Sequence, residues 1–319
     1  MLNRRHLRIK TLQSLYSFFY SGGTNLEYGE KELLRSIDKT KELFIWQLAL
    51  AIKLVDVAAA ITEIGKKKFF PTAEELNPNI RFINNKFIAG IRQNPDVIAN
   101  INKYKVSWDD NTEAIRRLYL AIKDSEQYKQ YLESEDTFSN DKDFIITVYT
   151  DFVFDNDFFA DFYETKSIYW YTDFCFMNFV MVKFIDGYKF SEESQPLPEM
   201  IKTVAYDTEY QDDKKFIIDL FDKVVIHKER NYNYIQSKVI NWEMERVSAM
   251  DTLIIEMAIT EILDFPTIPV KVSMNEYIEL SKIFSTPKSK FFINGILDSL
   301  VEDFNKKNLI NKTGRGLLG

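Results

Sequence analysis

The stretch "TPKSKFFINGILDSL", Thr286–Leu300, decides the fold. Its apolar residues recur at intervals of three and four positions, which is the period of an α-helix with one buried face. Thr286 is suited to cap a helix and Pro287 to be its first residue, so a helix is predicted to begin near Pro287. The apolar stripe of this helix consists of Ile293, Ile296, Leu297, Leu300 and Phe304.

An Asn-Gly pair, Asn294-Gly295, interrupts the middle of this helix. Glycine inside a helix costs roughly 1 kcal/mol relative to alanine. At 100° per residue, Gly295 lies about 200° from Ile293, away from the buried stripe. We therefore expect a second surface to approach Gly295 closely, either another helical bundle or a ligand backbone. Asn294 is interpreted as a structural hydrogen-bonding residue.

The rest of the chain has the same helical character. Of its 319 residues, only 10 are glycine and 8 are proline, while 45% are hydrophobic and 28% charged. The sequence predicts an all-α protein with a sizeable core. The expected helices cover Asn3–Ser21, Tyr28–Ile64, Ala73–Tyr104, Asn111–Leu132, Lys142–Glu164, Ile168–Tyr188, Asp213–Ile240, Trp242–Asp264, Pro269–Phe284 and a last helix from Pro287.

Charge is distributed unevenly along the chain. The formal net charge is −7, and residues Asp124–Asp173 contain 13 acidic residues against 3 lysines. Both ends are basic, which is compatible with local binding of an anionic partner. The single cysteine, Cys175, excludes an internal disulfide and is interpreted as a buried, inert thiol. The strongest membrane candidate, "FCFMNFVMV", is far shorter than the roughly 20 residues that a span needs, so a cytoplasmic location is expected.

The sequence contains no recognisable catalytic constellation. It has two histidines, and no HExxH, GxSxG or phosphate-binding glycine motif occurs. Asp157, Asp161 and Glu164 share a helical face, which is interpreted as a solvated acidic face rather than a metal site. We expect no catalytic residue, no metal and no cofactor, and therefore a protein that is not an enzyme.

The first helix carries a line of residues that changes from cationic to apolar: Arg5, Arg8, Leu12, Leu15 and Phe19. A buried stripe does not accommodate unpaired guanidinium groups. The first two turns are therefore predicted to protrude from the core or to meet an anionic partner. Two interpretations stay open here: a solvated helix end, and an arginine-rich segment that binds RNA phosphates.

The beginning of the last helix also combines cations with aromatic rings. Lys288 and Lys290 precede Phe291 and Phe292, at a helix N-terminus that itself favours anions. This combination is typical of a platform for single-stranded RNA, but core phenylalanines beside solvated lysines would give the same pattern.

Two further residues concern the neighbouring helices. "SMNEYIEL" contains a possible capping box, Ser273 to Glu276, but a helix that begins at Pro269 and includes Glu276 is preferred. Glu261 lies on an apolar stripe with Ile254 and Met257, and is predicted to be buried and paired.

Three segments resemble the NusB family. "RRHLRIKTLQSLY" is similar to its basic first helix, and "RVSAMDTLIIEMAITEIL" followed by "PVKVSMNEYIELSKIF" and "KFFINGILD" is similar to its C-terminal half. The resemblance implies an all-α fold of two packed helical bundles. It also implies an RNA-binding transcription antitermination factor that binds boxA-type single-stranded RNA together with NusE, a small-subunit ribosomal protein, within the antitermination complex of RNA polymerase.

The resemblance also implies which residues carry these contacts. The family's RNA-binding positions fall on Arg4, Arg5, Arg8, Gln13, Tyr16 and Phe292. The residue pattern adds Lys10, Lys288 and Lys290 as RNA-binding candidates, and Lys288 stands where the family often has an acidic residue, a change that favours phosphate contact. Asp251 is implied to contact NusE, and His6 stands where the family often has a basic residue.

The resemblance covers residues 1–21 and 214–306 only. Residues 22–213 are interpreted as a helical insertion after the first helix, acidic in its second half, and residues 307–319 as a flexible basic tail. A different function therefore stays open: a helical protein-interaction scaffold whose acidic insertion supplies the main binding surface.

Overall fold

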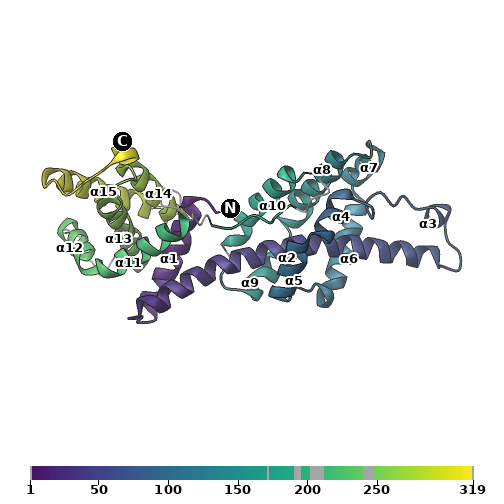
Figure 1. Ribbon diagram of the computed structural model, residues 1–319, viewed down its shortest axis with the longest axis horizontal. Coiled ribbons are helices and arrows are strands. Elements are labelled where there is room, and N and C mark those ends of the chain that lie inside the picture. The colour runs from purple at the N-terminus through teal and green to yellow at the C-terminus, as the bar shows by residue number, and fades with distance from the viewer. Residues whose placement is uncertain (1, 171, 190–194, 202–211, 240–246, 318–319) are drawn as a thin grey trace. The chain divides into compact units, whose positions relative to one another are not determined.

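The computed structural model of the protein describes residues 2–170, 172–189, 195–201, 212–239 and 247–317. Within these ranges every regular element is a helix and no strand occurs, which confirms the predicted fold class (Figure 1). The helices form two compact units. The first unit comprises Met1–Ile37 and Ile201–Gly319, and the second comprises Asp38–Met200.

The first unit is built around one central helix, α13. This helix packs against each of the other main helices of the unit, and every residue from Leu253 to Ile262 is buried. A helix that is buried on all sides belongs in the middle of a bundle. The helices of the unit are α1 (Arg4–Tyr20), the start of α2 (Leu26–Lys66), α11 (Asp213–Ile226), α12 (Lys228–Lys238), α13 (Ala249–Asp264), α14 (Val270–Phe284) and α15 (Ser289–Lys306).

The predicted stripe of the last helix is confirmed, because Ile293, Ile296, Leu297, Leu300 and Phe304 are all buried. The start of that helix differs from the prediction. Helix α15 begins at Ser289, and no side chain caps it.

Two other helices of this unit can be compared with the sequence predictions, one of which differs and one of which agrees. The helix expected over Asp213–Ile240 is divided at His227, which ends α11 and precedes α12. Glu276 lies inside α14, as preferred, and the buried hydroxyl of Ser273 donates to Glu261 instead of capping the helix.

The second unit is a bundle of shorter helices around the remainder of α2. Polar side chains such as Asn85, Asn94 and Ser125 accept from backbone amides at helix starts and thereby divide the longer helices that were predicted. The elements are α3 (Ala73–Leu76), α4 (Lys86–Gln93), α5 (Pro95–Tyr104), η1 (Asp109–Asn111), α6 (Thr112–Lys123), α7 (Glu126–Glu133), α8 (Phe138–Val148), the π-helical turn η2 (Tyr149–Val153), α9 (Asp157–Lys166) and α10 (Asp173–Gly187).

Aromatic side chains hold much of this second core together. The Trp108 ring stacks on Phe162 with centroids 4.6 Å apart and meets Trp46 edge-on at 5.1 Å. The Trp108 indole N–H also donates to the Trp46 carbonyl at 3.2 Å, so the buried polar group is satisfied. Cys175, in contrast, is an exposed free thiol, so the expectation of a buried thiol is wrong.

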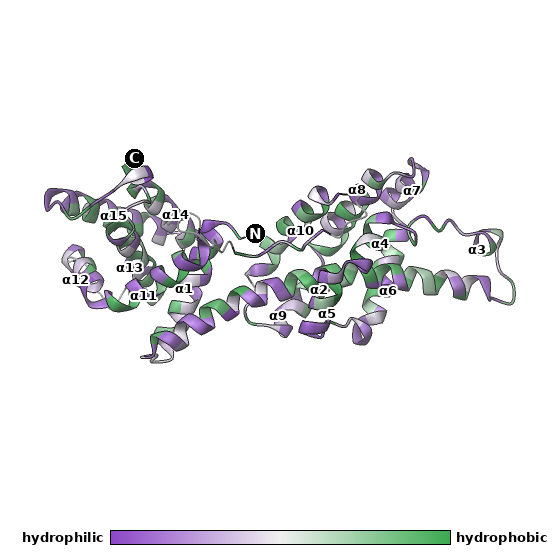
Figure 2. Ribbon diagram, viewed as in Figure 1, coloured by the Kyte–Doolittle hydropathy of each residue, from purple (hydrophilic) through white to green (hydrophobic). Residues whose placement is uncertain are grey.

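Helix α2 is polar in its first turns and largely apolar from Leu43 onwards (Figure 2). Among the described helices it is the one that is long and apolar enough to cross a membrane, a segment that the sequence analysis did not single out. Within the relevant window 67% is buried in the protein. Such burial is also found in the core helix of a soluble protein.

The C-terminal tail is folded against the first unit, contrary to the expected flexible tail. The Lys312 ammonium group donates to the Phe265 carbonyl at 2.9 Å, and the Thr313 amide donates to the Pro266 carbonyl at 2.9 Å. A short 3-10 helix, η4 (Gly314–Leu317), follows. The tail therefore covers the connection between α13 and α14.

The two units do not coincide with the domain boundaries taken from the sequence. Residues 22–37 belong to the first unit, and the division falls after 37 and after 200 instead of after 21 and after 213. The interpretation of residues 22–213 as an inserted region stays a prediction.

Candidate functional site

The arginines at the start of α1 each meet an acidic residue of another helix. Asn3 caps the helix by accepting from the His6 amide at 2.9 Å, which fixes the first turn. From that turn, Arg4 pairs with Asp213 of α11, Arg5 with Glu276 of α14, and Arg8 with Glu261 of α13.

Arg8 is part of the core and does not protrude. Only 3% of its side chain is exposed, and its Nε and Nη2 donate to the two oxygens of Glu261 at 2.8 and 2.7 Å. Ser273 and Tyr277 donate to the same carboxylate at 2.8 and 3.0 Å. The predicted burial and pairing of Glu261 is thus confirmed. The sequence predicted that the first two turns either protrude from the core or meet an anionic partner. Arg8 does not protrude, and the anionic group that it meets is the buried Glu261 carboxylate of the same chain, which compensates its charge.

The electrostatics of this pair follow from its surroundings. Burial alone would raise the pKa of Glu261, but the charge of Arg8 and the hydrogen bonds from Arg8, Ser273 and Tyr277 leave it lowered. Burial alone would lower the pKa of Arg8, but Glu261 leaves it raised. Both groups are therefore charged at neutral pH, and Arg8 is not available to a ligand.

Arg4 and Arg5 lie nearer to the surface. Arg5 binds Glu276 in a bidentate manner, with Nε and Nη2 at 3.0 and 2.9 Å from the two carboxylate oxygens. The Arg4 Nε lies 3.3 Å from an Asp213 oxygen, and its guanidinium group covers the Phe216 ring at 4.3 Å. Both side chains are partly exposed, so a phosphate can reach them.

His6 contributes no positive charge at neutral pH. Burial, together with the charges of Arg5 and Lys10, lowers its pKa to about 4. The cationic character of the helix start therefore comes from its arginines.

The other positions implied on α1 are less accessible. Lys10 is buried, with 2% of the residue exposed. Gln13 and Tyr16 are half-buried, and the Tyr16 ring stacks on Tyr20 at 5.7 Å. Of these three, only Gln13 and Tyr16 present surface to a ligand.

The start of α15 exposes cations and one aromatic ring. Lys288 is exposed, and the Lys290 ammonium group lies 4.8 Å from the centroid of the Phe291 ring. Phe291 is 72% exposed, whereas Phe292 is half-buried. The ring that is free to stack on a base is therefore Phe291, one residue before the aromatic that the resemblance implied.

Glu279 of α14 connects the two cationic regions. A hydrogen bond from Lys282 lowers the pKa of Glu279, and the charges of Arg5 and Lys290 lower it further. Arg5 and Lys290 are thus both close enough to act on one exposed carboxylate. Arg5 also contacts Glu276, one helical turn before Glu279, and α14 packs against α15. The start of α1 and helix α15 therefore both border α14.

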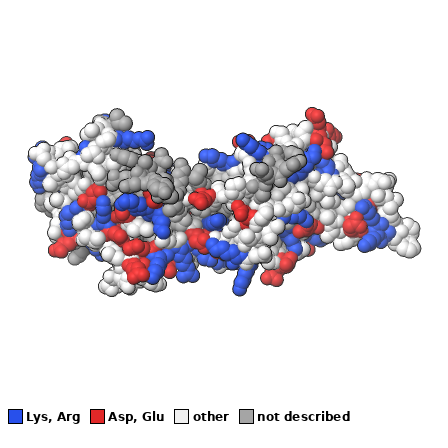
Figure 3. Space-filling model, in the orientation of Figure 1, with Lys and Arg blue, Asp and Glu red and all other residues white. Residues whose placement is uncertain are grey.

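Figure 3 shows that basic and acidic side chains alternate over the first unit on the face in view, instead of gathering by sign. The two glutamates of α14 were not anticipated as parts of the site. Their signal in the sequence is the i, i+3 spacing in "NEYIEL", which places both on one helical face.

Gly295 has open space around it. A Cβ atom built on it would meet no described atom within 4 Å. The sequence predicted that either another helical bundle or a ligand backbone approaches Gly295 closely. Within the described residues no helix does so, and the approach of a ligand backbone stays a prediction. Asn294 donates to Asp298 at 2.8 Å on the surface of the same helix.

Asp251 is enclosed, although the resemblance implies a partner contact. It is 6% exposed, and it accepts from the Ser289 hydroxyl at 2.8 Å and from the Ser285 hydroxyl. These bonds tie the first turn of α13 to the first turn of α15. Asp251 thereby positions the start of α15.

Residues 181–302 match the model of the NusB family. The chain is 40% identical over 106 residues to the transcription antitermination protein NusB of Salinibacter ruber, covering 33% of this chain and 66% of that protein. It is 37% identical over 105 residues to the NusB of Chloroherpeton thalassium, covering 33% and 50%.

A third relative, the NusB of Natranaerobius thermophilus, is 48% identical over 73 residues, covering 23% of this chain and 52% of that protein. The matches thus span half to about two thirds of the curated relatives and a third of this chain or less. No solved structure matches the chain.

Proposed function

Because the chain carries a NusB family domain, in a long form with an additional helical region, we propose that it is an RNA-binding transcription antitermination factor. In this proposal it binds boxA-type single-stranded RNA together with NusE and joins the antitermination complex of RNA polymerase on ribosomal RNA operons. It acts in the cytoplasm and catalyses no reaction.

One observation supports the proposal most strongly: the charges of Arg5 of α1 and Lys290 of α15 both act on the partly exposed carboxylate of Glu279, and Arg5 binds Glu276 on the same helix. Arg4, Arg5, Lys288 and Lys290 would contact backbone phosphates, because guanidinium and ammonium groups form charge-assisted hydrogen bonds to them. Phe291 would stack on a base, which is worth about 1–3 kcal/mol per base.

The two glutamates oppose this binding. Glu276 is bonded to Arg5, so an RNA phosphate competes with its carboxylate for that arginine, and the charge of Glu279, which pairs with Lys282, repels a phosphate near Arg5 and Lys290. Such competition weakens non-specific binding to any polyanion. It would make the fit of a particular RNA decisive.

Glu279→Gln is therefore expected to raise the affinity for boxA-type RNA by about two- to fivefold, since it removes a repulsive charge without changing the helix. Fluorescence anisotropy with a labelled single-stranded RNA measures the change. Glu113→Gln is a matched control, because Glu113 is an exposed carboxylate paired with an arginine on α6 of the second unit. An unchanged or lower affinity for Glu279→Gln would place the RNA elsewhere.

The contact with NusE is part of the proposal, and Asp251 would support it indirectly. Because Asp251 is bonded to Ser285 and Ser289, its replacement would shift the start of α15. We propose that the partner meets this end of the first unit and not the carboxylate itself.

A second candidate function, a protein-interaction scaffold, is favoured by the loop that follows α2. Phe69 and Phe70 are 91% and 85% exposed, and their rings contact each other edge-on at 4.7 Å. Two such exposed rings next to Lys66, Lys67 and Lys68 would fit an apolar groove with an acidic rim on a partner protein.

If the scaffold function holds, the double variant Phe69→Ser/Phe70→Ser will weaken binding to a reconstituted antitermination complex by at least about a hundredfold, because two buried phenylalanines at about 1.5–3 kcal/mol each contribute at least about 3 kcal/mol together. RNA affinity in the absence of other proteins should stay the same. Normal incorporation of the double variant would count against the scaffold.

A further inference from the structure

A cavity of the first unit lies where the folded tail meets the start of α1. It has a volume of about 1000 Å³, which is enough for a nucleotide. Apolar groups of Phe216, Phe265, Pro266 and Ile268 form part of its wall. Six cationic residues and three acidic residues line it. The cationic residues are Arg4, Arg5, Arg8, Lys215, Lys223 and Arg315, and the acidic residues are Asp219, Asp264 and Glu276.

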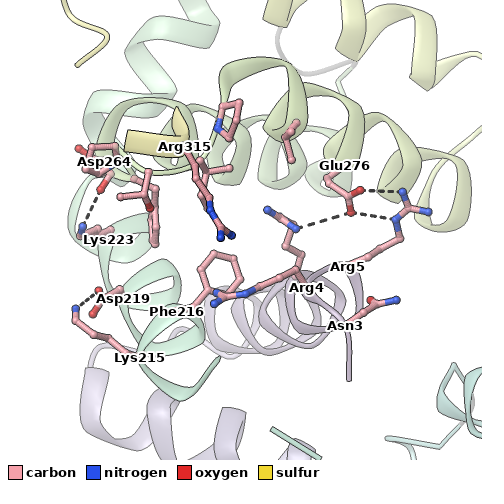
Figure 4. A pocket seen from close by; sticks show the side chains of 17 residues that line it. Asn3, Arg4, Arg5, Lys215, Phe216, Asp219, Lys223, Asp264, Glu276 and Arg315 are labelled. Atoms are coloured by element: carbon pink, nitrogen blue, oxygen red, sulfur yellow. Dashed lines mark hydrogen bonds and ion pairs between the residues drawn. The ribbon is translucent and has the colours of Figure 1, made fainter. Parts of the chain in front are cut away.

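Five of the six cations already have a partner within the protein. Arg4, Arg5 and Arg8 pair as described above, Lys215 pairs with Asp219, and the Lys223 ammonium group donates to the Asp264 carbonyl at 2.9 Å. For Arg315, the described residues provide no hydrogen bond or ion pair. Figure 4 shows its side chain reaching from the tail into the cavity, towards Phe216.

The tail is held against the α13–α14 connection, and this places the exposed Arg315 side chain beside the cavity. Besides the bonds of Lys312 and Thr313 to the α13–α14 connection, Gly316 lies directly against the Pro266 carbonyl. A Cβ atom on Gly316 would stand 2.0 Å from the Pro266 oxygen, so only glycine permits this approach. An arginine that such close packing holds beside a cavity, with no hydrogen bond or ion pair from the described residues, is arranged for an anion.

We propose that the Arg315 guanidinium group binds a backbone phosphate of the RNA in this cavity. This inference rests on the proposed function, because the cavity contains Arg4 and Arg5 of the RNA-binding face. The tail thereby extends that face beyond α1 and α15. The planar guanidinium group suits the ligand, since it can donate two parallel hydrogen bonds to two phosphate oxygens.

The test is a titration of the full chain with a labelled boxA-type single-stranded RNA at several salt concentrations. We expect Arg315→Gln to weaken binding about fivefold and to reduce the slope of log affinity against log salt by about 0.7, the value for one phosphate on a single strand. Lys307→Gln is the matched control, because it removes the same charge from an exposed position of the tail outside the cavity. Its expected change is less than twofold.

A second variant tests the tail itself. Gly316→Val should displace the tail from Pro266 and weaken RNA binding as much as Arg315→Gln does. Equal affinities of Arg315→Gln, Gly316→Val and Lys307→Gln would overturn the inference. Failure of the unaltered protein to bind RNA would instead overturn the proposed function.

Inorganic phosphate distinguishes the two possible sources of the anion. At constant ionic strength, 1 mM phosphate (about the level at which a weak free-anion site would begin to fill) should leave the RNA affinities of the unaltered protein and of Arg315→Gln unchanged. Equal RNA affinities of the unaltered protein and of Arg315→Gln, together with a phosphate binding that calorimetry without RNA detects only in the unaltered protein, would assign the cavity to free phosphate and overturn the assignment to RNA.

Discussion

Arg8→Ala is expected to lower the free energy of unfolding by about 3–5 kcal/mol, because it leaves the Glu261 carboxylate buried without a compensating charge. Glu261 is fully buried at the centre of the first unit, and Arg8 supplies two of its four hydrogen bonds. Chemical denaturation followed by circular dichroism measures the loss.

Arg5→Ala is the matched control. Arg5 also forms a bidentate pair with a glutamate, but it is partly exposed, and an exposed pair contributes about 0–1 kcal/mol. A double variant, Arg8→Met/Glu261→Leu, should recover much of the stability, because an apolar pair of similar volume needs no charge compensation. Equal, small losses for Arg8→Ala and Arg5→Ala would show that Arg8 is not part of the core.

The pH dependence of stability gives a signature of the pair. The pKa of Glu261 is lower in the folded protein than in the unfolded chain, where it is about 4.3. The ionised carboxylate therefore stabilises the folded protein fully above the unfolded pKa, and this stabilisation is lost as the pH falls through the folded pKa. In Arg8→Ala the unpaired, buried carboxylate would have a raised pKa. Acidification from pH 7 towards 5 should therefore reduce the stability difference between the variant and the unaltered protein.

Arg4→Gln/Arg5→Gln is expected to weaken binding of boxA-type RNA by roughly tenfold or more and to reduce the salt slope by about 1.4, the equivalent of two phosphate contacts. Both side chains are at the surface, and their replacement leaves the Arg8–Glu261 pair in place. The double variant should therefore fold normally. This makes it a cleaner test than any variant that includes Arg8.

The matched control is Arg116→Gln/Arg117→Gln on α6. These two arginines are exposed and pair with a glutamate, so the control removes the same charge from the second unit. Its RNA affinity should change by much less than that of Arg4→Gln/Arg5→Gln. If the two double variants weaken binding equally, the effect is one of net charge and not of a defined face.

The spacing of apolar residues along the sequence predicted which face of each helix is buried where that face depends on local pattern alone. The stripe of α15 is buried as expected, and the all-α class follows from the scarcity of glycine and proline. Arg8 and Glu261 were two anomalies, each a charge on an apolar stripe of its own helix. They lie 253 positions apart, and the sequence pattern alone did not show that each compensates the other.

The candidate face was only partly predictable, for a similar reason. The cations of α1 and α15 are visible in the sequence, but the glutamates of α14 that separate them become part of the site only through packing of the helices. Arg315 could not be assigned, because the tail has no apolar period. Its position depends on a carbonyl contact of Gly316.

If the first unit presents a cationic face to single-stranded RNA, its affinity for RNA must fall as salt rises. The affinity of the unaltered protein for boxA-type RNA between about 50 and 200 mM salt measures this dependence. Contacts from Arg4, Arg5, Lys288, Lys290 and Arg315, at about 0.7 for each phosphate, predict a slope of log affinity against log salt between about −3 and −4. An absence of binding, or an affinity that does not depend on salt, would contradict the claim.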